Sequence, residues 1–138
     1  MIISRTPIRV SFFGGGTDYR GYYERKRGQI LGSAINKYVY VSVSPNSQFF
    51  DYKTRIAYRK TELVKNIDEI EHPSVKACLQ FMDIQEPLDI NIFSDVPART
   101  GLGSSSSFTV GFLNALYALK GRRVSSQKLA EDACYVEQ

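Results

Sequence analysis

The chain has 138 residues, of which 43% are hydrophobic and 23% charged, a balance typical of a globular domain with its own core. No run of apolar residues is long enough to cross a bilayer and Met1–Arg5 does not begin a signal peptide, so we expect a cytoplasmic protein with no membrane partner and with Cys78 and Cys134 as free thiols. The net charge of +4 is spread over several clusters, which fits a phosphorylated small molecule as well as RNA.

The first 60 residues are rich in predicted strands. Residues 2–13 predict a strand, and Pro7 within it favours an edge strand or a bend because proline cannot donate to a ladder. Branched and aromatic side chains predict the next strands. These strands are expected at residues 29–35 and 38–43, and in a hairpin formed by residues 49–52 and 54–60.

Three consecutive glycines, Gly14, Gly15 and Gly16, follow the first predicted strand. Glycine permits a tight turn and the close approach of a ligand. Asp18, two residues later, could accept hydrogen bonds from vicinal sugar hydroxyls. Its carboxylate could equally cap a helix over residues 19–26, and the residues alone leave both roles open.

The middle of the chain predicts a helix over residues 73–82, because Pro73 suits a first turn. Its apolar residues fall on one face of that helix: Val75, Cys78, Leu79 and Met82. His72 is the sole histidine; we expect it in a surface loop, and assign it no role as a metal ligand or base. A strand at residues 88–93 follows, with alternating apolar and polar residues.

A stretch that runs from Pro97 to Ser107 leads into a helix over residues 108–119. Gly101 and Gly103 allow unusual backbone angles, and the serines stand where the first N–H groups of a helix have no partner within it. Such a helix start attracts anions, and phosphate is the obvious ligand. Gly and Ser before a helix are also ordinary turn and cap residues, although a solubilising Ser run should not lead into a buried helix. No Lys-Ser or Lys-Thr follows the glycines, so this is not a Walker A loop.

Residues 125–138 predict a final helix, with Leu129, Ala133 and Val136 on one side. Glu137 falls off that side. Most such glutamates are solvated surface charges.

Two of these stretches resemble motifs of the GHMP kinases. Pro97, Gly101, Leu102, Gly103, Ser104 and Ser105 are in register with the central motif of that superfamily. Arg9, Thr17, Asp18 and Tyr19 match its first motif. Gly15 and Gly16 replace the Glu-His of galactokinases, and this form is similar to that of heptose kinases.

The resemblance implies an α+β fold with two layers, like domain 2 of ribosomal protein S5, with a mostly antiparallel sheet and helices on one side. It implies that residues 1–138 are the N-terminal, ATP-binding domain of a truncated chain that lacks a C-terminal domain. It also implies an ATP-dependent transfer of phosphate to a sugar, most specifically to the anomeric hydroxyl of D-glycero-D-manno-heptose 7-phosphate. The expected partners are ATP and this sugar phosphate, without nucleic acid, and a homo-oligomer stays open.

The resemblance also distributes roles over the site residues. Pro97, Gly101, Leu102 and Gly103, together with Ser104, Ser105, Ser106 and Ser107, are expected to bind the ATP phosphates. Ser105 and Glu137 are expected to hold Mg2+. Gly14, Gly15, Gly16, Thr17, Asp18 and Tyr19 are expected to bind the sugar, with Asp18 and Arg9 at the reacting centre.

Three alternatives remain. The chain could belong to a kinase of another small molecule, such as a fucose- or galactose-like sugar. It could be a non-catalytic RNA-binding module, which aromatic side chains beside basic ones on an exposed sheet face would favour. It could also be a nucleotide-binding regulator without turnover.

Overall fold

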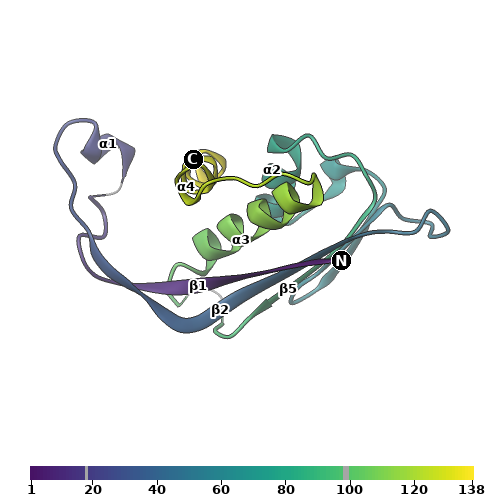
Figure 1. Ribbon diagram of the computed structural model, residues 1–138, viewed down its shortest axis with the longest axis horizontal. Coiled ribbons are helices and arrows are strands. Elements are labelled where there is room, and N and C mark those ends of the chain that lie inside the picture. Colours follow the sequence, from purple (N-terminus) through teal and green to yellow (C-terminus); the bar gives the residue numbers. More distant parts are fainter. Residues whose placement is uncertain (18, 98–99) are drawn as a thin grey trace.

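The computed structural model describes residues 1–17, 19–97 and 100–138. The chain folds into one five-stranded sheet with helices packed on it (Figure 1). In chain order the elements are β1 (Ile2–Phe13), α1 (Arg20–Tyr23), β2 (Leu31–Pro45), β3 (Thr54–Ala57), β4 (Thr61–Val64), a 3-10 turn (Ile67–Glu69), α2 (Pro73–Phe81), β5 (Leu88–Ser94), α3 (Ser104–Leu119) and α4 (Ser126–Glu137). None of the described helices combines the length and hydrophobicity needed to cross a membrane.

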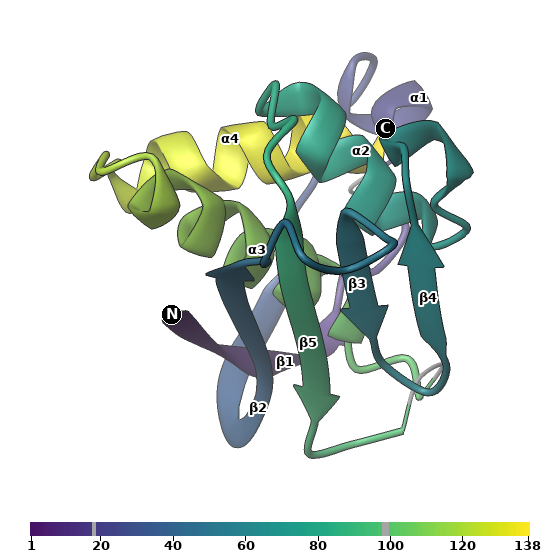
Figure 2. The same cartoon turned by 90° about the vertical axis from the view of Figure 1, so that its right-hand side faces the viewer.

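The strand order is β1-β2-β5-β3-β4, and every neighbouring pair is antiparallel except β3 and β5. Helices α2, α3 and α4 lie on the same side of this sheet (Figures 1 and 2). Helix α3 packs directly on β1 and β2, whereas α4 packs on α3 and α2. The expected α+β fold, with a mostly antiparallel sheet and helices on one side, is confirmed.

Strand β1 lies at the edge of the sheet, as Pro7 predicted. Its register with β2 shifts between Pro7 and Arg9, where a bulge interrupts the ladder. Pairing continues beyond the bulge, so β2 is a single strand and not the two strands expected from the sequence. The polar pair Asn36–Lys37 looked like a break, but backbone pairing with β1 on both sides of it keeps the strand extended.

The prediction of a hairpin around residues 51–53 was wrong in position. The observed hairpin joins β3 to β4, and residues 49–52 form no strand. Strand β3 is fixed by parallel pairing with β5, which sets Ile56 opposite Ile90. Both side chains are fully buried, so a contact distant in sequence decides where the strand begins. The helix expected over residues 19–26 is also shorter, because only Arg20–Tyr23 is α-helical.

The core lies between α3 and the sheet. Phe112, Leu113 and Leu116 of α3 are fully buried there. Gly111 lets the helix come close to β1, since a Cβ at this position would stand 2.4 Å from the Thr6 hydroxyl oxygen. This close packing fixes the start of α3 relative to β1, the strand that carries Arg9.

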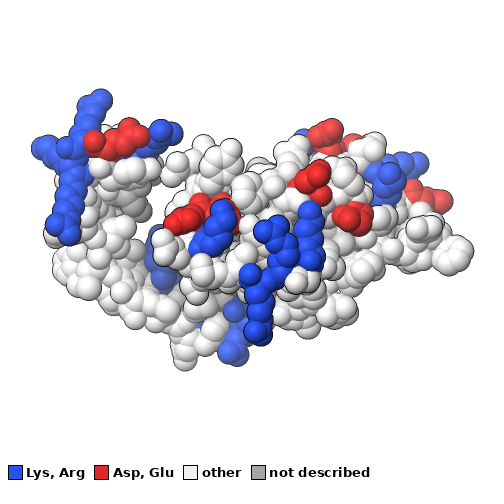
Figure 3. All heavy atoms as spheres, turned by 45° about the horizontal axis from the view of Figure 1, so that its top comes forward, with Lys and Arg blue, Asp and Glu red and all other residues white. Residues whose placement is uncertain are grey.

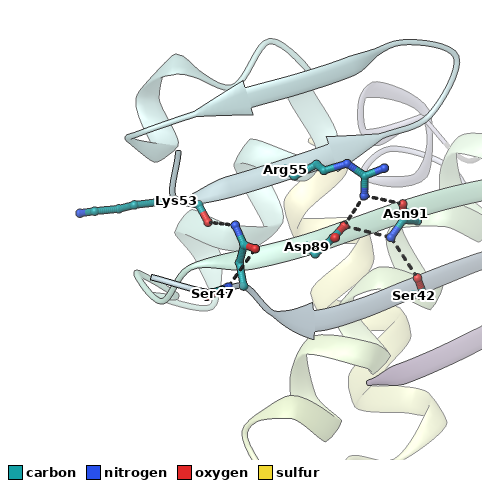
Figure 4. Close-up of polar contacts among 7 residues, drawn as sticks. Ser42, Ser47, Lys53, Arg55, Asp89 and Asn91 are labelled. Atoms are coloured by element: carbon teal, nitrogen blue, oxygen red, sulfur yellow. Dashed lines mark hydrogen bonds and ion pairs between the residues drawn. The ribbon is translucent and has the colours of Figure 1, made fainter. Parts of the chain in front are cut away.

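None of the described helices covers the opposite face of the sheet (Figures 1 and 2). Toward one end of this face the Arg55 guanidinium donates to Asp89 over 2.8 Å and to Asn91 over 3.1 Å, and the Asn91 amide reaches Ser42 (Figure 4). On β1, the Arg5 guanidinium lies 4.6 Å from the centre of the Tyr38 ring.

Candidate functional site

The start of α3 is built to leave backbone donors free. Gly103 is the N-cap residue, with φ of 68°, and Gly101 has φ of 73°, both in the left-handed region that favours glycine. No side chain of the described residues caps this end. The first N–H groups of a 16-residue helix therefore point outward together with the positive end of its dipole, which suits an anion.

Glu137, at the end of α4, meets this helix start. Its Oε1 accepts from the Thr109 hydroxyl over 3.0 Å and from the Ser105 hydroxyl over 3.4 Å. Its Oε2 accepts from the Ser106 hydroxyl over 3.0 Å. The fold thus brings together Ser105 and Glu137, which are 32 positions apart in sequence.

A pocket of about 410 Å³ opens at this junction of the starts of α2 and α3 with the end of α4. The residues that line it are Pro73, Ser74, Ser105, Ser106, Val136 and Glu137. Burial raises the pKa of the nearby Cys78 thiol to about 12, with a further contribution from the charge of Glu137. Cys78 is therefore a neutral thiol; both cysteines are free, as the sequence predicted.

The oxygen atoms at this junction suit Mg2+. Among the described residues no three His, Cys, Asp or Glu side chains gather as a metal site. One carboxylate and one hydroxyl, completed by phosphate oxygens and water, are a normal environment for Mg2+, which seldom has an all-protein cage. Ser105 and Glu137 therefore fit such an ion only together with a phosphate ligand.

Arg9 connects the strand motif with this helix start. A Cβ on Gly103 would stand 3.1 Å from Cζ and 3.2 Å from Nη1 of Arg9, so the guanidinium lies against the N-cap of α3. The three described heavy atoms nearest to such a Cβ all belong to this guanidinium. A positive group here adds to the field that favours an anion at the helix start.

The backbone of the turn after β1 itself requires glycine at some of its positions. Gly14 has φ of 92°, and a Cβ on it would stand 2.0 Å from the Gln29 carbonyl oxygen. The Thr17 hydroxyl oxygen lies 2.8 Å from the Gly14 carbonyl oxygen and 3.1 Å from that of Gln29, and its one hydrogen can be donated to either. Gly16 has φ of 100°, while Gly15 is exposed. The turn is thus held in shape by the Thr17 side chain and by close packing against the Gln29 backbone.

Several predicted residues lie around these groups without joining them. Tyr19 is 74% exposed, and Asp18 lies outside the described residues. Ser107 is buried and donates to the Pro7 carbonyl over 3.0 Å, which ties α3 to β1. Leu102 packs against the core. Ser104 is half-buried, and Pro97 is exposed.

The sequence predicted His72 in a surface loop; the residue does lie outside α2, but it is half-buried and not a surface residue. The ring packs 4.9 Å from that of Tyr58 and 5.3 Å from that of Phe108, between centroids. Its Nδ1 accepts from the Val75 N–H over 3.4 Å and so caps α2. Burial lowers the pKa of His72. The signal was its place directly before Pro73, which is where an N-cap residue stands.

Comparison with known proteins assigns a family to the part of the chain that contains the glycine- and serine-rich start of α3. Residues 73–138 match the model of the GHMP kinases N terminal domain. The chain carries a GHMP kinase N-terminal domain. It is 26% identical to the D-glycero-alpha-D-manno-heptose 7-phosphate kinase of Campylobacter jejuni, over 99% of this chain and 43% of that protein. It is 24% identical to the mevalonate kinase of Saccharolobus solfataricus, over 99% of this chain and 44% of that protein. The GHMP kinase domain thus spans less than half the length of these relatives.

Solved structures have the same fold as this GHMP kinase domain. A D-glycero-D-manno-heptose 1-phosphate kinase from Bacteriodes thetaiotaomicron superposes with a TM-score of 0.81 at 24% identity, over 99% of this chain and 48% of that one. A mevalonate kinase superposes with a TM-score of 0.74 at 21% identity, over 99% of this chain and 46% of that one. The expected likeness to ribosomal protein S5 domain 2 is confirmed through this fold.

Proposed function

We propose that this protein is an ATP-dependent kinase of a sugar phosphate, and that residues 1–138 supply its phosphate- and Mg2+-binding part. The observation that carries the proposal is the meeting of Glu137 with the serine hydroxyls at the uncapped start of α3. Phosphoryl transfer needs groups that bind phosphate, a ligand for Mg2+ and a positive charge near the group in transfer. The free N–H groups at the start of α3, the Glu137 carboxylate and the Arg9 guanidinium supply these within one small region. The family match supports the same reading.

Residues of the α3 start would hold the nucleotide. The N–H groups after Gly101 and Gly103 would bind phosphate oxygens, and Ser105 with Glu137 would hold Mg2+. When bound, Mg2+ neutralises part of the charge on the phosphates. Arg9, which lies against Gly103, would stabilise negative charge on the group in transfer. The chain's own contribution is thus orientation and charge.

The acceptor would lie beside the glycine turn. In this proposal the residues from Gly14 to Tyr19 bind the sugar, with Asp18 accepting hydrogen bonds from its hydroxyls. We assign the anomeric hydroxyl of D-glycero-D-manno-heptose 7-phosphate as the acceptor group. The supports are the Gly-Gly-Gly-Thr-Asp form of the turn and the resemblance to a heptose 7-phosphate kinase.

An arm at the far end of β1 and β2 could bind the phosphate that this sugar already carries. Figure 3 shows basic side chains gathered on this arm. Arg20 pairs with Glu24 over 2.7 Å, whereas no described acidic side chain pairs with Arg25, Lys26 or Arg27. Unpaired cations on an exposed arm suit a phosphate better than a neutral sugar.

We infer that the protein acts in the cytoplasm. We also infer that turnover needs a further region, corresponding to the part of the relatives' sequences that does not align with residues 1–138. The curated relatives are more than twice as long as the aligned region. In two-domain kinases of this kind the acceptor site lies in a cleft, so residues 1–138 alone should bind ATP weakly and release no ADP in response to sugar.

The decisive test is an ADP-release assay with ATP, Mg2+ and a panel of sugars and sugar phosphates. We expect turnover with a heptose 7-phosphate and little with galactose, fucose or mevalonate. Asp18→Asn should raise the KM for the sugar or abolish turnover while nucleotide affinity stays near that of wild type. Normal kinetics with a lowered Tm in Asp18→Asn would instead favour the helix-capping role.

One observation favours the RNA-binding alternative. The Arg5 guanidinium lies over the Tyr38 ring on the open sheet face, next to Tyr40 and to Phe93, which is 67% exposed. Such a surface can stack unpaired bases. Arg55 on the same face is already paired with Asp89, which leaves little excess positive charge there. Salt-dependent binding of single-stranded RNA, lost in Tyr38→Ala, with no ATP binding, would select this alternative.

A further inference from the structure

Thr109 is a buried polar residue that neither sequence motif includes. It lies one turn into α3 and is 0% exposed, yet its hydroxyl oxygen is 3.0 Å from Oε1 of Glu137. The same hydroxyl is 3.2 Å from the Ser105 carbonyl oxygen. The Thr109 hydroxyl has one hydrogen to donate. A charged carboxylate is a stronger acceptor than a carbonyl that already accepts a backbone hydrogen bond within the helix. The contact with Glu137 is therefore the one that matters.

Glu137 needs such a partner because of where it lies. It is the last residue of α4, and helix ends fray unless tertiary contacts hold them. Each carboxylate oxygen receives a hydrogen bond that is 3.0 Å long, Oε1 from Thr109 and Oε2 from Ser106. The Ser105 contact is the longest of the three, at 3.4 Å. Thr109 and Ser106 thus hold the carboxylate and leave Ser105 available for another ligand.

We propose that Thr109 is a positioning residue that fixes the carboxylate of Glu137 for the cation bound with the nucleotide. The inference rests on the proposed function. A carboxylate has about four lone-pair sites, so it can accept from Thr109 and Ser106 and still bind a metal ion. Groups that orient a metal ligand are typically worth roughly 10- to 100-fold in metal affinity or activity.

Thr109 offers a clean set of variants. Thr109→Val keeps the branched shape and removes the hydroxyl, while Thr109→Ser keeps the hydroxyl and removes the methyl group. Because the residue is buried, a merely structural role would make both variants defective. A positioning role predicts a defect in Thr109→Val and function in Thr109→Ser.

The test is the affinity of the chain for ATP, measured by calorimetry in EDTA and in excess Mg2+. The ratio of the two affinities isolates the contribution of the metal. We expect Thr109→Val to reduce this ratio roughly 10-fold, with the affinity in EDTA unchanged. Thr109→Ser should keep the wild-type ratio. Glu137→Gln should reduce the ratio, and adding Thr109→Val to it should cause no further loss.

An unchanged ratio in Thr109→Val would overturn the inference, as would an equal loss of affinity in EDTA. Failure of the proposed function looks different, because the wild-type chain would then bind ATP equally with and without Mg2+. In that case a double-mutant cycle on the free energy of unfolding, with Thr109→Val and Glu137→Ala, decides the matter. Non-additive effects would support the link between the two residues, and strict additivity would refute it.

Discussion

Gly103 and Gly121 stand at the two ends of α3 with nearly the same backbone, at φ of 68° and 67°. An alanine at either position meets the left-handed region, which costs about 1–2 kcal/mol. We therefore expect Gly103→Ala and Gly121→Ala to lower the free energy of unfolding by similar amounts in urea titrations. The surroundings differ, because apart from its chain neighbours no described residue has an atom within 4 Å of a Cβ on Gly121.

A Cβ on Gly103 would stand 3.1–3.3 Å from three atoms of the Arg9 guanidinium. The arginine is exposed and can move aside at little cost in stability. Its displacement from the start of α3 should weaken ATP binding by roughly 10-fold or more, the effect of one lost hydrogen bond to a charged group. Gly121→Ala should bind ATP like the wild type. Equal ATP affinities for the two variants would refute the role of Arg9 in binding phosphate at this helix start.

Three further outcomes follow from contacts elsewhere in the chain. Gly111→Ala should destabilise the protein by about 1–3 kcal/mol in urea, since its Cβ would stand 2.4 Å from the Thr6 hydroxyl oxygen; a wild-type Cm would contradict this packing. The pKa of His72 is lowered by burial, so the unfolded chain takes up the proton first. Stability should therefore fall as pH drops below about 6.5, and His72→Gln should lose this part of the pH dependence of unfolding. Tyr117→Phe should cost about 1–3 kcal/mol, because Asp132, a buried carboxylate, would lose a donor at 2.7 Å; an unchanged Tm would show that Lys128 suffices.

Local signals predicted the parts of the fold that depend on local chemistry. A helix over residues 108–119 was predicted because glycines, serines and an apolar face with helical spacing follow one another in sequence; α3 begins four residues earlier, at Ser104, because the serine run forms its first turn. The helix that begins at Pro73 was predicted for the same kind of reason. The position of β3 was not, since the pairing of Ile56 with Ile90 joins residues 34 positions apart and no local pattern records it.

The site divides in the same way. The motif indicated Ser105 and Ser107 alike, but only the fold separates them: Ser105 faces Glu137, while Ser107 is bonded to the Pro7 carbonyl 100 positions away. The role we propose for Thr109 could not be read from sequence either. Its partner Glu137 is 28 positions away, and a lone threonine in a helix has no spacing signature. The assignments of ATP, Mg2+ and Asp18 stay predictions.

Among the described elements, helix α4 packs on α3 and α2 and not directly on the sheet (Figure 1). It can therefore open without disturbing the sheet, and its amide protons should exchange with solvent faster than those of α3. Glu137 belongs to this outermost helix, so a ligand that binds its carboxylate stabilises the state in which α4 is packed on α3. Such a ligand should slow amide exchange along the whole of α4. Hydrogen exchange in α4 would then report on occupancy at the start of α3, so that the least protected helix serves as the indicator of a bound nucleotide.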